Sequence, residues 1–303
     1  MKIGIVAPSD WFSKKLLAGG IRIIEKHGHE VVLAKNINKK IKDFMAGSVE
    51  ERLADLAELA NSDAEVIWAA EGGYAATEIR YGLEEIKNGL KERLLIGYSD
   101  ITNLHLAWRC WGGRGLYAPT VCRLSQWSIE STDKLFELLD GSTSMSYEGG
   151  VGVVSGKALG TMVAGNLETM TLCAGTEYDP LLMSAGPVIL GIEEYQQELS
   201  LINRQLDQVL DSKRIGRVTG FVLGRFCQLK ESSYPEWAKQ TSVSEMISNK
   251  LLRRGIRIPV WQFDGWGHET RKGAKDDFYP IMNGAKTKLD VDSGGGRMKM
   301  EWS

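Results

Sequence analysis

Apolar and polar residues follow one another along the first hundred residues in a pattern that predicts strands and helices in turn. Four short, largely apolar runs are typical of strands and cover residues 2–7, 30–34, 64–70 and 94–97. Three segments with helical spacing separate them, at residues 13–27, 49–60 and 77–90, and Ser48 with Glu51 predicts a capping box before the second. Alternating strands and helices predict an α/β fold with a doubly wound parallel sheet.

The loops after the predicted strands are candidates for a binding site. In doubly wound sheets, ligands bind beyond the carboxyl ends of the strands. Three polar or glycine-rich loops fall at this edge: Ala7-Pro8-Ser9-Asp10, Glu71-Gly72-Gly73-Tyr74 and Tyr98-Ser99-Asp100. We therefore expect functional residues in these loops.

Ser99 stands at the corner between a predicted strand and a helix-like segment, residues 103–108. This layout is similar to the nucleophile elbow of G-x-S-x-G hydrolases, although the glycine after the serine is missing. In such an elbow the serine hydroxyl stands clear of the backbone, and the N–H of Asp100 points toward the group that is attacked. The alternative is an ordinary polar turn in which Ser99 or Asp100 caps the helix.

A nucleophilic serine needs a base, and histidine is scarce in this chain, at positions 27, 29, 105 and 268. His268 is the best candidate, because it follows an apolar run in the glycine-rich segment Gly265-Trp266-Gly267-His268. Such a loop exposes the imidazole, although a loop histidine without a catalytic task has the same pattern. His105 lies on the predicted helix after Ser99, where packing explains it.

This chemistry also requires an acid that orients the histidine. It requires an oxyanion hole as well. Glu193 and Glu194 follow an apolar strand, where a carboxylate can hold a histidine in one tautomer. The alternative is that they are a pair of solvated acids at the start of a loop. Gly72-Gly73 offers backbone N–H groups that could form an oxyanion hole with the N–H of Asp100. A plain tight turn is the competing interpretation.

The pattern changes near residue 150. Residues 141–146 and 148–150 predict a linker or an exposed hairpin, and the following residues are richer in glycine and short strands. Further strands are expected at residues 157–160, 187–192, 216–224, 257–261 and beyond 290, with a helix at 199–210. We therefore expect two domains, residues 1–150 and 151–303.

Composition narrows the functional classes. The 303 residues are 43% hydrophobic and 25% charged, which is typical of a soluble globular protein, and the net charge of −2 gives no reason to expect a nucleic acid or membrane partner. The four cysteines are widely spaced, which predicts reduced thiols and no metal site. The sequence has neither a signal peptide pattern nor a run of eighteen apolar residues, so we expect a cytoplasmic protein.

Several motifs occur in register from Ile3 to about Leu289. They are Ile5-Val6-Ala7-Pro8-Ser9, residues 44–48 and 51–56, Ala70-Glu71-Gly72-Gly73-Tyr74, Ile96-Gly97-Tyr98-Ser99-Asp100-Ile101-Thr102, Gly165-Asn166-Leu167, Glu193-Glu194 with Ile202-Asn203-Arg204, and Gly267-His268 with Pro280 and Gly284. Together they resemble the motifs of the LD-carboxypeptidases, a serine peptidase family that includes muramoyl-tetrapeptide carboxypeptidases and microcin C immunity peptidases.

The resemblance implies a role for each matching position. Ser99 would be the nucleophile, His268 the general base and Glu193 the acid that orients it, with the N–H groups of Asp100 and Gly73 as the oxyanion hole. It also implies a flavodoxin-like first domain, a smaller β-rich second domain, and a reaction without metal or organic cofactor.

Departures from the family pattern bear on the substrate. Glu71 stands where many members carry arginine, Ala75 replaces a glycine, and Trp266 replaces a phenylalanine; the common Pro-Pro after the acid is replaced by Tyr195-Gln196-Gln197. A carboxylate at position 71 is expected to repel a substrate carboxylate. The expected substrate-binding residues are Glu71, Gly72, Tyr74 and Asn166.

The sequence therefore predicts a serine carboxypeptidase that cleaves an L,D bond in a murein-derived tetrapeptide. An immunity peptidase that cleaves a peptidyl-nucleotide is the alternative within the same class. A non-catalytic protein that binds a small metabolite is the alternative of another class, and the complete set of serine, glutamate and histidine argues against it. We also expect a homodimer.

Overall fold

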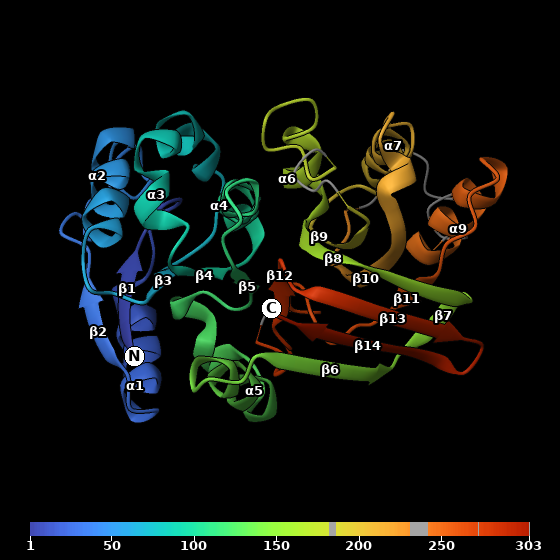
Figure 1. Cartoon of the computed structure of the whole chain (residues 1–303). Helices are drawn as coiled ribbons and strands as arrows, with labels where there is room; N and C mark the ends of the chain where they lie inside the picture. Colours follow the sequence, from blue (N-terminus) through green and yellow to red (C-terminus); the bar gives the residue numbers. More distant parts are fainter. Residues whose placement is uncertain (182–185, 231–241, 272, 303) are drawn as a thin grey trace. The chain divides into compact units, whose positions relative to one another are not determined.

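The computed structural model describes residues 1–181, 186–230, 242–271 and 273–302 (Figure 1). The chain divides into two compact units. The first contains Met1–Ser142 and Lys275–Gly284, and the second contains Thr143–Ala274 and Ala285–Ser303. Each unit is built on its own sheet, of six strands in the first and eight in the second.

The first unit contains the predicted doubly wound parallel sheet. Its strand order is β12-β5-β4-β3-β1-β2, in which the five parallel strands follow the flavodoxin-like order and β12 is antiparallel to β5. The strands are β1 (Lys2–Val6), β2 (Glu30–Leu33), β3 (Val66–Ala69), β4 (Leu94–Gly97), β5 (Gly115–Tyr117) and β12 (Ile281–Asn283). The four strands predicted in the first hundred residues are therefore confirmed, with ends that differ by at most two residues.

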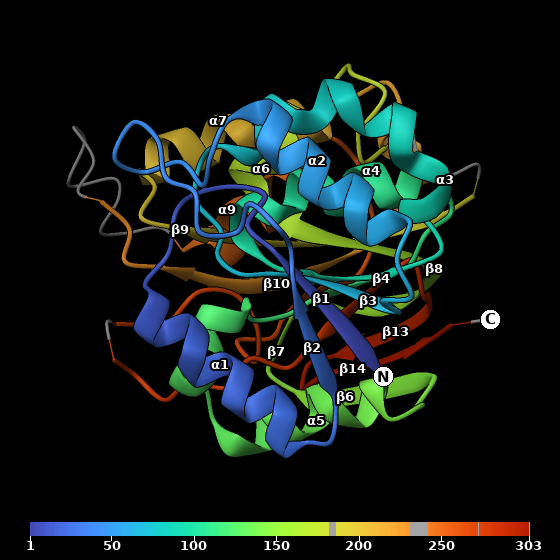
Figure 2. The same ribbon diagram turned by 90° about the vertical axis from the view of Figure 1, so that its left-hand side faces the viewer.

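Helices cover both faces of this sheet. Figure 2 shows α1 and α5 on one face and α2, α3 and α4 on the other. The helices are α1 (Lys14–Lys26), α2 (Val49–Ala60), α3 (Lys87–Leu90), α4 (Thr102–Cys110) and α5 (Ile129–Leu139), with 3-10 turns η1 (Ala76–Ile86), η2 (Ser99–Ile101) and η3 (Val121–Gln126). The capping box of Ser48 and Glu51 is present at the start of α2, as predicted.

One predicted helix of this unit has a different form. Residues 77–90 were expected to be α-helical, but Ala76–Ile86 forms 3-10 turns and only Lys87–Leu90 is α-helical. Two glycines in this segment weaken an α-helix, and Gly82 lies so close to Leu53 of α2 that an added Cβ would be 2.4 Å from its Cδ1. The glycines and the close packing against α2 therefore account for the 3-10 turns in place of a regular α-helix.

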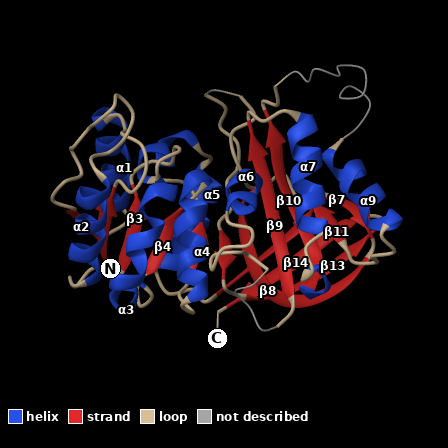
Figure 3. Ribbon diagram, turned by 90° about the horizontal axis from the view of Figure 1, so that it is seen from above, coloured by secondary structure: helices blue, strands red, loops and turns tan. Residues whose placement is uncertain are grey.

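The second unit is built on a mixed sheet with the strand order β6-β14-β13-β8-β9-β10-β11-β7. Strands β8 to β11 are parallel, and the remaining pairs are antiparallel. Figure 3 shows α6, α7 and α9 on one side of this sheet. The strands are β6 (Ser144–Gly149), β7 (Val151–Val154), β8 (Gly156–Asn166), β9 (Val188–Tyr195), β10 (Val218–Cys227), β11 (Val260–Gln262), β13 (Lys286–Asp292) and β14 (Gly295–Glu301); the helices are α6 (Leu167–Leu172), α7 (Leu199–Leu210) and α9 (Val243–Arg253), with the 3-10 turn η4 (Ile215–Arg217).

The segment predicted as a linker or exposed hairpin is part of this sheet, so that prediction is wrong. Strand β6 pairs with β14, and β7 pairs with β11 at the other end of the strand order. In β6, Met145 and Tyr147 are buried while Ser146 and Glu148 are exposed, an alternation that the neighbouring glycines and serines concealed.

The division between the units is not a single boundary along the chain. The change of unit falls between Ser142 and Thr143, because β6 pairs within the second sheet. Residues 275–284 return to the first unit, where β12 pairs with β5 and the buried Phe278 packs edge-on against Tyr98 with ring centroids 5.1 Å apart. No described helix is long and apolar enough to cross a membrane.

Candidate active site

Ser99 occupies a strained backbone position at the carboxyl end of β4. Its φ is +61°, in the left-handed region that residues other than glycine rarely adopt. Two hydrogen bonds hold it there: its N–H donates to the Tyr117 hydroxyl at 3.0 Å, and its carbonyl accepts from the Thr102 hydroxyl at 2.6 Å. Such strain persists only where the surroundings enforce it, and it is common at catalytic residues.

The Asp100 side chain stabilises this turn through three hydrogen bonds. Its Oδ2 accepts hydrogen bonds from the Ser9 hydroxyl at 2.5 Å and the Ala76 N–H at 2.8 Å, and its Oδ1 accepts from Asn103 Nδ2 at 2.9 Å. Burial raises the pKa of this carboxyl to about 6. Asp100 thereby ties the loops after β1 and β3 to α4, which fixes the position of Ser99.

The loop that contains Gly72 and Gly73 lies directly against Ser99. A Cβ added to Gly72 would be 3.2 Å from Ser99 Cβ, so the two backbones approach closely. Gly73 has a φ of +133°, and an added Cβ would fall 2.0 Å from Asp10 Cγ. Asp10 holds the loop further, because its N–H donates to the Gly72 carbonyl and its Oδ1 accepts from the Tyr74 N–H. Glycine is therefore required at position 73.

Two backbone N–H groups in the first unit suit an oxyanion hole. Asp100 lies in the first turn of η2, between Ser99, whose N–H donates to Tyr117, and Ile101, whose N–H donates to the Tyr98 carbonyl. The first N–H groups of a helix have no intrahelical partner, so that of Asp100 can donate to a ligand. The N–H of Gly73 makes no hydrogen bond with the described residues.

Glu71 is paired with Arg123, which changes the expectation that it acts as an isolated negative charge. Its Oε2 accepts from Arg123 Nε at 2.9 Å, and its Oε1 accepts from the Thr120 hydroxyl at 3.3 Å and from the Gly72 N–H at 3.2 Å. Its side chain is only 15% exposed. The carboxylate therefore orients the Glu71–Gly72 peptide, and Arg123 compensates its charge. The Tyr74 side chain, in contrast, is 80% exposed.

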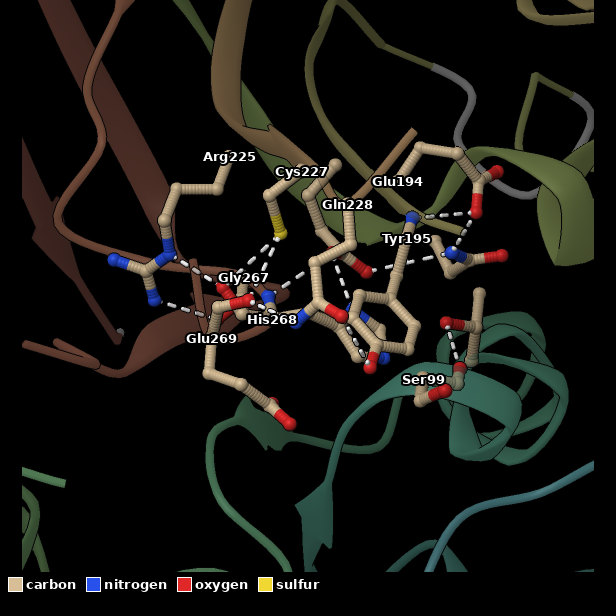
Figure 4. A network of polar contacts seen from close by, with 12 residues as sticks. Ser99, Glu194, Tyr195, Arg225, Cys227, Gln228, Gly267, His268 and Glu269 are labelled. Atoms are coloured by element: carbon tan, nitrogen blue, oxygen red, sulfur yellow. Dashed lines mark hydrogen bonds and ion pairs between the residues drawn. The ribbon is translucent and has the colours of Figure 1, made fainter. Parts of the chain in front are cut away.

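His268 and Glu193 are in direct contact in the second unit. His268 Nδ1 lies 2.7 Å from Glu193 Oε2, and the same oxygen accepts from the His268 N–H at 3.2 Å. Burial lowers the pKa of His268, but the adjacent Glu193 charge and its hydrogen bond outweigh this and raise the pKa above its ordinary value. The Tyr195 ring stacks on the imidazole, with centroids 4.5 Å apart (Figure 4).

Glu194 shares one partner with its neighbour, because Asn166 Nδ2 also donates to Glu193 Oε1 at 3.5 Å. Its oxygens accept from Asn166 Nδ2 and from the Glu168 N–H, both at 2.8 Å. Burial and the nearby Glu193 charge raise the pKa of Glu194 to about 7. The Asn166 Oδ1 accepts from the Thr169 N–H as the N-cap of α6, so both ends of this side chain have partners within the protein.

The structure thus groups the sequence-predicted residues in two sets. Ser99, Gly72, Gly73 and Asp100 come together in the first unit, and Glu193, His268, Glu194 and Asn166 come together in the second. His105 is buried and its Nε2 lies 2.9 Å from the Gly97 carbonyl oxygen, in agreement with its expected packing role. The described residues contain no group of three or more ligands that could hold a metal.

Three residues that support these two sets could not be identified from the sequence. They are Tyr117, Arg123 and Arg225, and each acts through a contact that joins distant parts of the chain. Arg123 lies 52 residues from Glu71, and Arg225 lies 43 residues from His268. Only the charge at Glu71 gave a signal in the sequence, because a carboxylate that is largely buried needs a cation or hydrogen-bond donors nearby.

Comparison with known proteins identifies the chain. Models of the LD-carboxypeptidase N-terminal domain and C-terminal domain match residues 3–117 and 159–289. The chain belongs to the LD-carboxypeptidase family and is a carboxypeptidase, a class of hydrolase. A putative carboxypeptidase of Synechocystis is 27% identical over 97% of this chain and 92% of its own length. A probable murein peptide carboxypeptidase of Bacillus subtilis is 26% identical over 84% of this chain and 80% of its own length.

Solved structures share the fold. Muramoyltetrapeptide carboxypeptidase from Oxalobacter formigenes matches with a TM-score of 0.84 and 22% identity, covering 100% of this chain and 99% of the other. MccF in complex with glutamyl sulfamoyl guanosine matches with a TM-score of 0.81 and 17% identity, covering 100% and 96%.

Proposed function

We propose that this carboxypeptidase is a serine peptidase in which Ser99, His268 and Glu193 form the catalytic triad. The observation that carries the proposal is the 2.7 Å contact between His268 Nδ1 and the buried Glu193 carboxylate, because a catalytic imidazole needs an acid that fixes its tautomer. The strained backbone of Ser99 supports the assignment of the nucleophile.

The proposed reaction proceeds through an acyl-enzyme. Ser99 Oγ attacks the scissile carbonyl carbon while His268 Nε2 accepts the hydroxyl proton, and the N–H groups of Gly73 and Asp100 stabilise the oxyanion. When the intermediate collapses, the C–N bond breaks and His268 returns the proton to the leaving amine. Water then attacks the acyl-enzyme with His268 as base, which releases the shortened peptide and restores the Ser99 hydroxyl.

We propose a murein-derived tetrapeptide as the substrate, cleaved at its terminal L,D bond. The names of the Bacillus subtilis relative and the Oxalobacter formigenes neighbour support this substrate class. The Glu71–Arg123 pair supports it as well, because a compensated carboxylate repels the terminal carboxylate of such a peptide less than an isolated one. We place Glu71, Gly72, Tyr74 and Asn166 near the bound peptide, with Glu71 and Asn166 acting through other residues.

A peptidyl-nucleotide is the second candidate substrate. It is favoured by the MccF structures with aminoacyl sulfamoyl nucleosides, which share this fold over the whole chain. We further propose that the enzyme is a cytoplasmic homodimer. Light scattering coupled to size-exclusion chromatography tests the oligomeric state, because a monomer would give a molar mass of 33.6 kDa, that of one chain.

The substrate assignment is tested by incubating the enzyme with two compounds, a murein tetrapeptide that ends in D-alanine and a peptidyl-adenylate analogue. Mass spectrometry follows the loss of the terminal residue from each. Faster release of D-alanine supports the murein substrate, and preferential cleavage of the adenylate supports the second candidate. His268→Ala is the control for contaminating peptidases. Cleavage of neither compound overturns both assignments.

A further inference from the structure

A buried arginine holds the loop that contains His268. Arg225 lies near the end of β10, and the residue is only 5% exposed. Its guanidinium donates to the carbonyls of Asp264, Gly267 and His268, the last two at 2.6 Å, and its backbone N–H donates to the Trp266 carbonyl at 3.0 Å. Figure 4 shows the side chain reaching this loop. One residue therefore satisfies four carbonyl groups between residues 264 and 268.

The loop needs such a partner because of its own conformation. Gly267 has a φ of +98°, and a Cβ added to it would be 3.1 Å from the Glu193 side chain, so the loop is pressed against the acid. This bend turns several loop carbonyls toward the protein interior, where an unpaired carbonyl is costly. The planar fork of an arginine carries donors on three nitrogens and can serve several separated carbonyls at once, whereas the donors of a lysine are all on one nitrogen.

His268 is held on both sides of its α-carbon. Its carbonyl accepts from Arg225 Nε at 2.6 Å, and its N–H donates to Glu193 Oε2 at 3.2 Å. The imidazole in turn contacts that same carboxylate oxygen at 2.7 Å. A shift of the loop would therefore move the imidazole relative to Glu193 even though Arg225 does not contact the ring.

We propose that Arg225 is a positioning residue for the general base: it fixes the backbone of residues 264–268 and so keeps His268 in register with Glu193. The inference rests on the proposed function, in which His268 is the base. Displacement of a catalytic group by about 1 Å can cost on the order of a hundredfold in rate, so loss of this support should reduce turnover strongly.

The test compares Arg225→Met and Arg225→Lys with the matched control Arg254→Met. Arg254 lies in the same unit, where it pairs with Asp207 and Asp211 outside this loop. For each variant, circular dichroism reports folding, and steady-state hydrolysis of the tetrapeptide gives kcat and KM. The pH dependence of Ser99 labelling by a fluorophosphonate then reports the state of the His268 base, which a merely structural role would leave unchanged.

We expect folded Arg225→Met to lose at least about thirtyfold in kcat, with KM changed by less than about threefold. The pH midpoint of labelling should shift, Arg225→Lys should fall between Met and wild type, and Arg254→Met should stay within about twofold of wild type. If Arg225→Met does not fold, the test relies on Arg225→Lys, for which we expect a loss of about tenfold in kcat.

Unchanged kcat and labelling midpoint in a folded Arg225 variant would overturn the inference, as would a change confined to KM, which would place Arg225 against the substrate. Ser99→Ala and His268→Ala separate this failure from failure of the proposed function. If both of these variants are inactive while the Arg225 variants are fully active, only the positioning role is wrong.

Discussion

Glu193 Oε2 accepts two hydrogen bonds from His268, one from the ring Nδ1 at 2.7 Å and one from the backbone N–H at 3.2 Å. The buried carboxylate therefore fixes both the ring and the backbone of the histidine. Its neighbour Glu194 accepts from the Glu168 N–H at the start of α6 and from Asn166 Nδ2, which also lies 3.5 Å from Glu193 Oε1. The contact with His268 supports the proposed orienting role of Glu193, and the following predictions depend on that proposal.

Glu193→Gln should lower kcat strongly and move the pH profile toward acid. In the wild type, Glu193 holds the pKa of His268 above its ordinary value, so activity that needs the neutral base should rise only as pH passes that raised pKa. Without the charge, burial lowers the pKa and the rising limb moves to lower pH. The measurement is kcat/KM against pH. A limb that stays in place would show that Glu193 does not control this titration.

Arg123→Gln should lower kcat/KM about tenfold on the tetrapeptide that ends in a carboxylate. The substitution leaves the largely buried Glu71 charge without its cation, and this charge can then repel the substrate or distort the Gly72 peptide. The double variant Glu71→Gln/Arg123→Gln should recover most of the loss, because both charges are gone. A double variant as poor as Arg123→Gln alone would show that the Glu71 charge is not the cause.

The same pair reverses the effect expected of Glu71→Arg. If Glu71 were an isolated charge, its replacement by arginine would raise kcat/KM on the tetrapeptide. Beside Arg123, however, this replacement places two cations next to each other. We expect lower kcat/KM on the tetrapeptide, and recovery in the charge-swapped variant Glu71→Arg/Arg123→Glu. Improved activity of Glu71→Arg alone would indicate that position 71 contacts the substrate carboxylate directly.

Gly73→Ala should abolish activity and lower Tm. The added Cβ would meet Asp10 Cγ at 2.0 Å, and the φ of +133° is unfavourable for any residue with a Cβ. Gly19→Ala is the matched control, because it lies within α1 and its added Cβ meets nothing within 4 Å. This control should keep full activity and gain up to about 1 kcal/mol in the free energy of unfolding. Near-normal turnover in Gly73→Ala would exclude its N–H from a fixed oxyanion hole.

The first sheet could be predicted from the sequence because its signals are local. Apolar runs mark β1 to β4, and Ser48 with Glu51 marks the start of α2, all within short stretches of chain. The return of residues 275–284 to β5 left no comparable signal, because the pairing of Ile281 with Tyr117 joins segments that are far apart in sequence. Long-range pairing has no local pattern.

The candidate site was predictable to a similar extent. Ser99 and His268 stand out through their loops, and alternation along a strand limits the acid to Glu193 or Glu194. The choice between them depends on which face of β9 meets the loop of His268, and that is set by tertiary packing. The partnership of Glu71 with Arg123 likewise became visible only in the folded chain.

The role of Ser99 as nucleophile is tested by the kcat of Ser99→Ala on the cleaved substrate, with circular dichroism to confirm folding. Ser99 is half-buried and its side chain carries no structural hydrogen bond among the described residues, so its removal should leave the fold intact. We expect a loss of several orders of magnitude in kcat, as removal of a nucleophile produces in other serine peptidases. A folded Ser99→Ala variant that keeps more than about a tenth of the wild-type kcat, a difference of only ~1.4 kcal/mol, would contradict this role.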